Sequence, residues 1–175
     1  MAYHTVMPLE RLKSERLELS ALDCDELRGL LERRVKGLEL ADTLLSLSIE
    51  RAVRIKLEKM AHVGLKDHVW FTYWLIVLRE SERGIGLVGF KGIPDECGEV
   101  DIGYGLTLEY EGQGYMSEAV RSLIGWAFSQ KDCAVIAPST AKTNLASRRV
   151  LEKVGMTVYQ ETAGERFWRL EKGKR

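Results

Sequence analysis

Residues 99 to 119 read EVDIGYGLTLEYEGQGYMSEA, and they carry the clearest fold signal in the chain. The pattern up to Leu108 predicts a strand, and the apolar stripe after Gly114 predicts a helix ending near Ser129. Gly112 and Gly114 in the intervening turn let the backbone approach a ligand closely. The free N–H groups of the first helical turn and the helix dipole favour an anion there, and phosphate is the natural candidate.

Two other readings of this G-x-G turn stay open. It can be an ordinary strand-to-helix connection in which glycine serves only the geometry. It also partly matches the dinucleotide fingerprint G-x-G-x-x-G, but Ser117 stands where the third glycine belongs. The antiparallel hairpins expected upstream do not suit an all-parallel dinucleotide fold, so a nucleotide-binding regulator is the weakest of these readings.

Hydrophobic periodicity predicts elements in the order β-α-α-β-β-β-α-β-α-β-β. Hairpins combined with one β-α-β crossover predict an α+β fold with a mixed, mostly antiparallel central sheet and helices on both faces. With no linker or repeat, residues 1–175 are expected to form a single domain. The predicted strands cover residues 12–20, 70–78, 85–92, 99–108, 134–137, 158–160 and 166–170, and the predicted helices follow a cap at Asp23 and cover 43–60, 114–129 and 144–154.

Composition argues against several classes of protein. The formal charge is zero, with 26 basic and 26 acidic residues, so no broad nucleic-acid surface is expected. The longest apolar stretch, residues 69–78, is too short to span a bilayer, and the N-terminus lacks a signal-peptide pattern. Cys24, Cys97 and Cys133 are far apart and form no CxxC, so neither disulfides nor structural zinc are expected, and a reducing cytoplasm fits.

Six segments carry a family pattern: SERLEL (14–19), YWLIV (73–77), IGLVGF (85–90), DIGY (101–104), GQGYMSEA (112–119) and NLASRRVLEKVGM (144–156). In these segments the chain resembles the GNAT superfamily of N-acetyltransferases, particularly its ribosomal-protein-type (Rim-like) N-terminal acetyltransferase branch. The resemblance implies the acyl-CoA N-acyltransferase fold and acetyl-CoA as co-substrate, with no metal. It also implies direct attack of a primary amine, through a tetrahedral intermediate, with a small-molecule amine or a protein N-terminus as acceptor.

The same resemblance assigns the coenzyme site. The Asn144 amide should bond the pantetheine arm, although Asn is also a favoured helix N-cap and the two roles are compatible. Glu111 and Met116 depart from the family's usual loop pattern Q/R-x-x-G-x-G/A, and Glu111 places a carboxylate near the expected phosphates. The pyrophosphate should lie on Gly112, Gln113, Gly114, Tyr115, Met116 and Ser117, and the pantetheine should run beside the backbone of Leu106, Thr107 and Leu108.

Three residues are candidates for catalysis. Glu99 and Asp101 lie two apart on the predicted strand and should share one face, where a carboxylate can act as general base. Many members of the family place a general-acid tyrosine in the last helix; here Leu151 stands there, and Ser147 is the branch's alternative proton donor. Each has a structural alternative: Glu99 and Asp101 can simply form a solvated strand face, and Ser147 can be a small solvated or packing residue on a helix.

The acceptor remains open at the level of sequence. Helices between residues 23 and 65 should wall its site by analogy, while the aromatic run 70–74 fits either that wall or the core. A non-catalytic acyl-CoA-binding or sensory module is the alternative function, and the chain is expected to be a monomer or homodimer. Acidic residues predominate between 79 and 118 and basic ones between 131 and 175, so we expect the acidic segment to face a cationic amine. Arg148, Arg149 and Lys153 would then lie toward the coenzyme phosphates.

Overall fold

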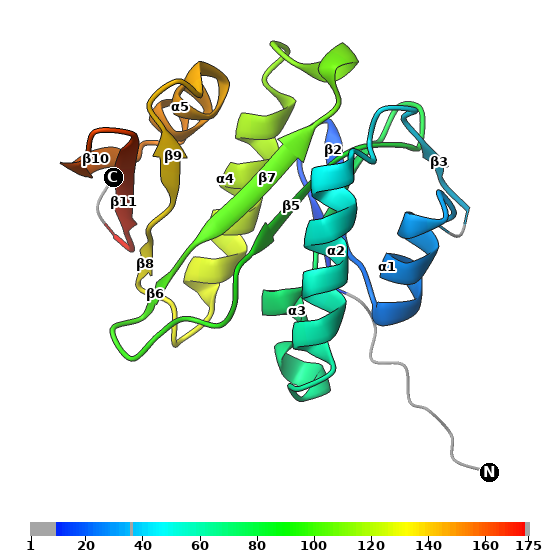
Figure 1. Cartoon of the computed structure of the whole chain (residues 1–175), viewed down its shortest axis with the longest axis horizontal. Coiled ribbons are helices and arrows are strands. Elements are labelled where there is room, and N and C mark those ends of the chain that lie inside the picture. Colours follow the sequence, from blue (N-terminus) through cyan, green and yellow to red (C-terminus); the bar gives the residue numbers. More distant parts are fainter. Residues whose placement is uncertain (1–9, 36, 174–175) are drawn as a thin grey trace.

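The strands form two sheets that meet at the run of chain from residue 99 to residue 106 (Figure 1). The computed structural model describes residues 10–35 and 37–173. Its strands are β1 (Arg11–Lys13), β2 (Leu17–Ala21), β3 (Glu39–Leu40), β4 (Trp74–Leu78), β5 (Arg83–Phe90), β6 (Glu99–Val100), β7 (Ile102–Leu106), β8 (Val135–Ile136), β9 (Ser139–Ala141), β10 (Thr157–Glu161) and β11 (Glu165–Glu171). The six-stranded sheet has the order β1-β2-β4-β5-β3 with β7 beside β5, and the five-stranded sheet has the order β10-β11-β8-β6 with β9 beside β11.

Helices cover both faces of the larger sheet. They are α1 (Cys24–Leu31), α2 (Leu47–Met60), α3 (His68–Phe71), α4 (Tyr115–Ser129) and α5 (Leu145–Lys153), with 3-10 helices η1 (Leu65–Asp67) and η2 (Leu108–Tyr110). Along β4, Trp74 and Ile76 pack into the core cluster that contains α4, whereas Leu75 and Val77 pack into the cluster that contains α1 and α2. Figure 1 shows α2 and α4 on opposite sides of the sheet. The predicted α+β class, with a mostly antiparallel sheet between helices, is confirmed.

The two sheets separate where the pairing between β6 and β8 ends and the chain of β6 and β7 changes its partner. β6 pairs in parallel with β8 through Glu99–Val135 and Val100–Ile136. One residue later, β7 turns to β5 and pairs with it antiparallel over its whole length. On the other side, β11 pairs with both β8 and β9, so residues 135–141 stay with the same neighbour. The strand predicted over residues 99–108 is therefore interrupted at Asp101 and ends at Leu106.

Two other predicted strands are wrong in their boundaries. The strand predicted over residues 12–20 is the hairpin of β1 and β2. The strand predicted over residues 70–78 begins at Trp74, because Trp70 lies on α3 with its ring centroid 4.8 Å from that of Phe90. Short apolar runs do not distinguish a strand from a buried helical turn, so long-range packing decides. Trp70 and Trp74 are both buried in the core, as one of the two interpretations expected.

Local capping explains where the first helices begin. Asp23 caps α1 as predicted: its side chain accepts from Glu26 N, and the Glu26 carboxylate accepts from Asp23 N, so each satisfies a backbone donor of the other. The helix predicted from residue 43 begins instead at Leu47, where the Ser46 hydroxyl accepts from Ile49 N. The two-residue strand β3 and the three-residue strand β9 were not predicted, because elements this short carry little periodic signal.

A buried lysine fastens α2 to the sheet. Lys56 is 9% exposed, and its ammonium donates to the carbonyls of Phe71 (3.0 Å) and Phe90 (2.7 Å). It also lies 4.4 Å from the centroid of the Tyr73 ring, a cation–π distance. Burial lowers the pKa of Lys56 from 10.5 to about 7, and the positive charges of two nearby lysines add to this effect. The attachment of α2 therefore includes a group that changes charge near neutral pH.

We expect Lys56→Met to change the pH dependence of the free energy of unfolding. The folded pKa of Lys56 is about 7 and unfolding restores it to near 10.5, so the unfolded chain binds more protons between these values. Wild-type stability therefore rises with pH through this window. Lys56→Met lacks this gain. Its free energy of unfolding, measured with denaturant, should therefore fall by about 2 kcal/mol relative to that of the wild type between about pH 7 and about pH 9.

Val53→Ala is the matched control, because Val53 is fully buried on the same helix and does not titrate. It should lower the free energy of unfolding by a similar amount at each pH. Parallel pH profiles for the wild type and Lys56→Met would contradict the account of the buried ammonium.

Candidate functional site

A cleft of about 620 Å³ lies between β7, the turn before α4 and one side of α5. These three segments are separate in sequence, and the divergence of the two sheets brings them together. The cleft is lined by Tyr104, Gly105, Leu106, Glu111, Gly112, Gly114, Tyr115, Met116, Ser117, Asn144, Ala146, Ser147, Arg149, Val150 and Lys153.

The turn before α4 offers backbone donors to this cleft. Gly112 and Gly114 have φ values of 74° and 83°, in the left-handed region that glycine adopts without strain. Gly114 is the N-cap of α4, and its carbonyl accepts the helical bond from Glu118 N (3.1 Å). The N–H groups of the first helical turn have no intrahelical partner, and three of those residues line the cleft. With the positive end of the dipole of this 15-residue helix, they make a surface that can accept an anion.

The opposite wall is the beginning of α5. Asn144 is its N-cap, and the Asn144 Oδ1 atom accepts from Ser147 N at 3.0 Å. Both residues line the cleft. The capping role raised from the sequence is thus observed.

A hydrogen bond joins the two walls. The hydroxyls of Tyr104 on β7 and Ser147 on α5 lie 2.8 Å apart, and Tyr104 also donates to the Ser147 carbonyl at 3.3 Å. Burial raises the pKa of Tyr104 to about 12, with the hydrogen bond from Ser147 acting in the opposite direction. Tyr104 is therefore protonated at neutral pH and can act as a donor.

Sequence reasoning missed Tyr104 as a functional residue, because it looked only at the strand face that carries the carboxylates. The alternation of side chains along the strand could have identified it, because Tyr104 and Leu106 share a face of β7 and both line the cleft.

Neither predicted carboxylate lines the cleft. Glu99 is held by Arg169 of β11, with Oε2 3.2 Å from Nη1. Asp101 forms an ion pair with Lys91, next to β5, and its Oδ1 is buried without a hydrogen-bond partner. Glu99 is therefore paired with a residue of the five-stranded sheet, and Asp101 with the residue that follows β5 of the six-stranded sheet.

Three of the predicted coenzyme residues also lie outside the lining. Thr107 is buried, and its hydroxyl oxygen has no hydrogen-bond partner. Leu108 is 77% exposed at the start of η2. Gln113 donates its side-chain amide to the Glu109 carbonyl, so that side chain bonds within the turn.

The charges around the cleft are mixed. Arg149 and Lys153 line it, whereas Arg148 forms an ion pair with Glu152 on the same helix. Among the described residues of the lining, Glu111 is the one carboxylate. Two of the three predicted basic residues therefore line the cleft, and the predicted acidic face does not form in the lining.

The described part of the chain offers neither a metal-binding cluster nor a membrane-spanning helix. Residues 10–35 and 37–173 hold no group of three or more His, Cys, Asp or Glu arranged for a metal ion. Within the same ranges, every helix is too short or too polar to cross a membrane.

The sequence matches known acetyltransferases. The family described as acetyltransferase (GNAT) domain matches residues 44–157, which include the whole cleft lining. The uncharacterized N-acetyltransferase YjdG of Bacillus subtilis (strain 168) is 34% identical over 98 residues, which is 56% of this chain and 58% of that protein. The matched stretches span about half the length of the first curated relatives, between 44% and 58%.

Solved structures share the fold. The ribosomal-protein-S5-alanine acetyltransferase from Vibrio fischeri superposes with a TM-score of 0.66 at 17% identity, covering 94% of this chain and 97% of that one. RimL, a ribosomal L7/L12 alpha-N-protein acetyltransferase solved in complex with coenzyme A, gives a TM-score of 0.63 at 16% identity, covering 93% and 98%. Because the family match spans well over half of the sequence and the fold agrees, the chain belongs to the GNAT acetyltransferase domain family.

Proposed function

We propose that this protein transfers an acetyl group from acetyl-CoA to a primary amine, with the α-amino group of a polypeptide as preferred acceptor. The observation that carries the proposal is one cleft that joins the glycine turn of α4 to the Tyr104–Ser147 hydrogen bond. Coenzyme A bound to the structurally similar RimL supports this choice of co-substrate. Three free cysteines, Cys24, Cys97 and Cys133, fit a reducing, cytoplasmic setting.

The coenzyme would lie along the cleft from the α4 turn toward β7. The N–H groups of residues 112–117 would bind the pyrophosphate, and Arg149 and Lys153 would add positive charge nearby. The pantetheine arm would pass Leu106 and reach the Asn144 amide. Glu111 also faces this space, so we expect it to weaken binding relative to an amide or cationic residue at the same position.

Chemistry would take place beside the Tyr104–Ser147 pair. The amine nitrogen attacks the thioester carbonyl carbon, the oxyanion collapses, and the C–S bond breaks to release a thiolate. Ser147 Oγ gives the thiolate its proton while Tyr104 donates to Ser147, and the proton lost by the attacking nitrogen replaces it through solvent. Backbone N–H groups would stabilise the oxyanion.

The charge state of the acceptor favours an α-amine. No carboxylate other than Glu111 is in the described lining, and Glu111 belongs to the phosphate end. An α-amine has a pKa of roughly 8 and a lysine amine roughly 10.4, so near pH 7.5 about a quarter of the former but only about 0.1% of the latter is neutral.

Of the two predicted bases we keep Asp101, acting through water, because its Oδ1 lacks a hydrogen-bond partner and Glu99 is held by Arg169.

A coenzyme-binding module without catalysis is the second candidate. The lining favours it, because no carboxylate borders the reacting end of the cleft and a base at Asp101 would act only through intervening water. Binding without turnover would identify this second function.

We expect thiol release from acetyl-CoA when a short peptide with a free N-terminus is offered. The same peptide with a blocked N-terminus and one free lysine should react about 100-fold more slowly near pH 7.5, following the neutral fractions. Ser147→Ala should lower kcat at least about tenfold and leave the Kd for coenzyme A unchanged. Turnover confined to lysine or to small amines would contradict the acceptor, and no turnover with normal coenzyme binding would favour the module.

Two substitutions of Asn144 separate its two roles. Asn144→Asp keeps an oxygen that can accept from Ser147 N but removes the amide donor and adds negative charge. It should leave unfolding nearly unchanged and raise the Kd for coenzyme A about five- to tenfold. Asn144→Ala should also lower the free energy of unfolding by about 1 kcal/mol. Wild-type coenzyme affinity in Asn144→Asp would show that the residue acts as a cap alone.

A further inference from the structure

We propose that Arg16, in the turn between β1 and β2, is a positioning residue for the coenzyme-binding turn. It would hold the Gln113–Gly114 peptide in its binding orientation and cancel the charge of Glu118 at the start of α4. This inference rests on the proposed function, because it assigns Arg16 a part in binding acetyl-CoA.

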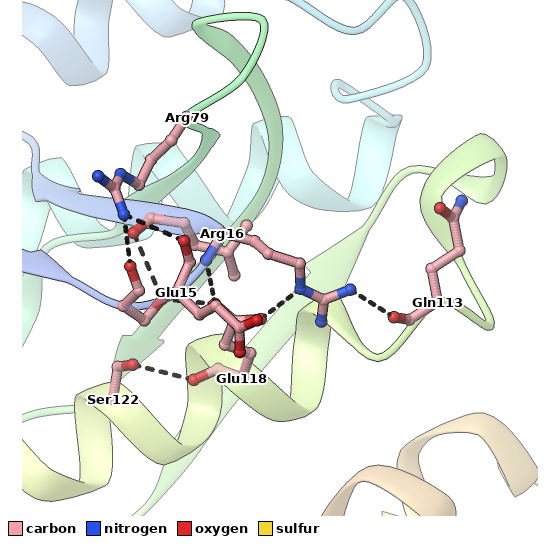
Figure 2. Close-up of polar contacts among 8 residues, drawn as sticks. Glu15, Arg16, Arg79, Gln113, Glu118 and Ser122 are labelled. Carbon is pink, nitrogen blue, oxygen red and sulfur yellow. Dashed lines mark hydrogen bonds and ion pairs between the residues drawn. The ribbon is translucent and has the colours of Figure 1, made fainter.

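Arg16 contacts the turn and the helix at the same time (Figure 2). Its Nη1 donates to the Gln113 carbonyl at 3.0 Å, and its Nε donates to Glu118 Oε2 at 2.8 Å. Its backbone N–H donates to the other carboxylate oxygen of Glu118, also at 2.8 Å, across 102 residues of sequence. The guanidinium carbon lies 4.4 Å from the centroid of the Tyr115 ring. The Arg16 side chain thus lies outside the cleft lining and contacts three parts of the turn and helix: the Gln113 carbonyl, the Tyr115 ring and the Glu118 carboxylate.

The bond to Gln113 sets the direction of a neighbouring donor. A trans peptide is planar, so its C=O and N–H point to opposite sides, and no described peptide bond is cis. Gly114 lines the cleft and Arg16 does not. By holding the Gln113 oxygen on its own side, Arg16 turns the Gly114 N–H toward the cleft, where an anion would bind.

The glycines make this anchoring necessary. Gly112 and Gly114 are both left-handed, and glycine loses more conformational freedom on ordering than any other residue. A Cβ built on Gly112 would meet nothing within 4 Å, so that residue is not held by packing. At Gly114 the near atom is Arg16 Nη2, at 3.5 Å from such a Cβ. Without Arg16 the turn would have to be ordered by the ligand itself, at a cost in affinity.

Arg16 also removes an electrostatic obstacle. Burial alone would raise the pKa of Glu118, but hydrogen bonds from Arg16 N, from Ser14 Oγ and from the Arg16 side chain outweigh it and lower that pKa. Glu118 is therefore ionised within the first turn of a helix whose N-terminus would bind phosphate. An unpaired carboxylate there would repel the coenzyme, and the Arg16 guanidinium compensates it.

Arg79 provides the matched control. Its Nη1 donates to the carbonyls of Ser14 (2.9 Å) and Glu15 (3.0 Å), so it stabilises the same β1–β2 turn. Figure 2 shows Arg79 on the far side of this turn from Gln113. If Arg16 only held the β1–β2 hairpin in place, its substitution should affect coenzyme binding no more than a substitution of Arg79 does.

The test compares coenzyme A binding by calorimetry and acetyl-CoA kinetics in the full chain. Arg16→Met should raise the Kd for coenzyme A and the KM for acetyl-CoA about tenfold, with kcat at saturation within about twofold and the acceptor KM unchanged. Arg79→Met should reduce thermal stability with a wild-type Kd. The double variant Arg16→Met/Glu118→Gln should recover about a third of the lost affinity on a logarithmic scale, because the repulsion is gone while the peptide stays unanchored.

Two outcomes would overturn the inference while leaving the proposed function intact: a wild-type Kd in Arg16→Met, or an equal rise of Kd in Arg79→Met. If Arg16→Met does not fold, Arg16→Lys carries the test, since lysine keeps the charge but cannot reach both partners with a planar fork. Its Kd should rise about threefold or more, and a wild-type value would overturn the inference. A wild-type protein that fails to bind coenzyme A would refute the proposed function itself.

Discussion

The site depends on where one backbone ladder stops. β6 and β8 pair only through Glu99–Val135 and Val100–Ile136; after that β7 pairs with β5, while β9 stays with β11, the strand that also pairs with β8. Because buried N–H and C=O groups must be satisfied, the strands can part only if each has a second strand to join. β5 and β11 provide those partners, and the cleft lies between β7, the turn before α4 and α5.

The N-terminal ends of two helices, α4 and α5, complete the wall of the cleft. The N-terminus of α4 and the N-terminal turn of α5 both line the cleft, so the unpaired N–H groups of α4 and the positive ends of both helix dipoles lie around one volume. The Tyr104–Ser147 hydrogen bond ties the walls together, and Arg16 holds the turn of α4 from behind. The chain thus combines a glycine turn free enough to fit a phosphate with an external contact that limits that freedom.

Features encoded locally could be predicted from the sequence. The glycine turn with its helix, the Asp23 cap and the Asn144 cap each depend on a few adjacent residues, and the structure contains all three elements. The interruption at Asp101 could not be predicted, because it arises from a choice among strand partners distant in sequence. The same reason hides the bond between Arg16 and Glu118 and the ion pairs that occupy Glu99 and Asp101.

Hydrogen–deuterium exchange of the full chain, with and without saturating coenzyme A, tests the central claim most directly, because it locates the ligand without relying on turnover. The account predicts slower exchange in two separate segments, the α4 turn at residues 112–118 and the beginning of α5 at residues 144–150. Unchanged exchange in both segments while coenzyme A is bound, or protection confined to β10 and β11, would contradict it.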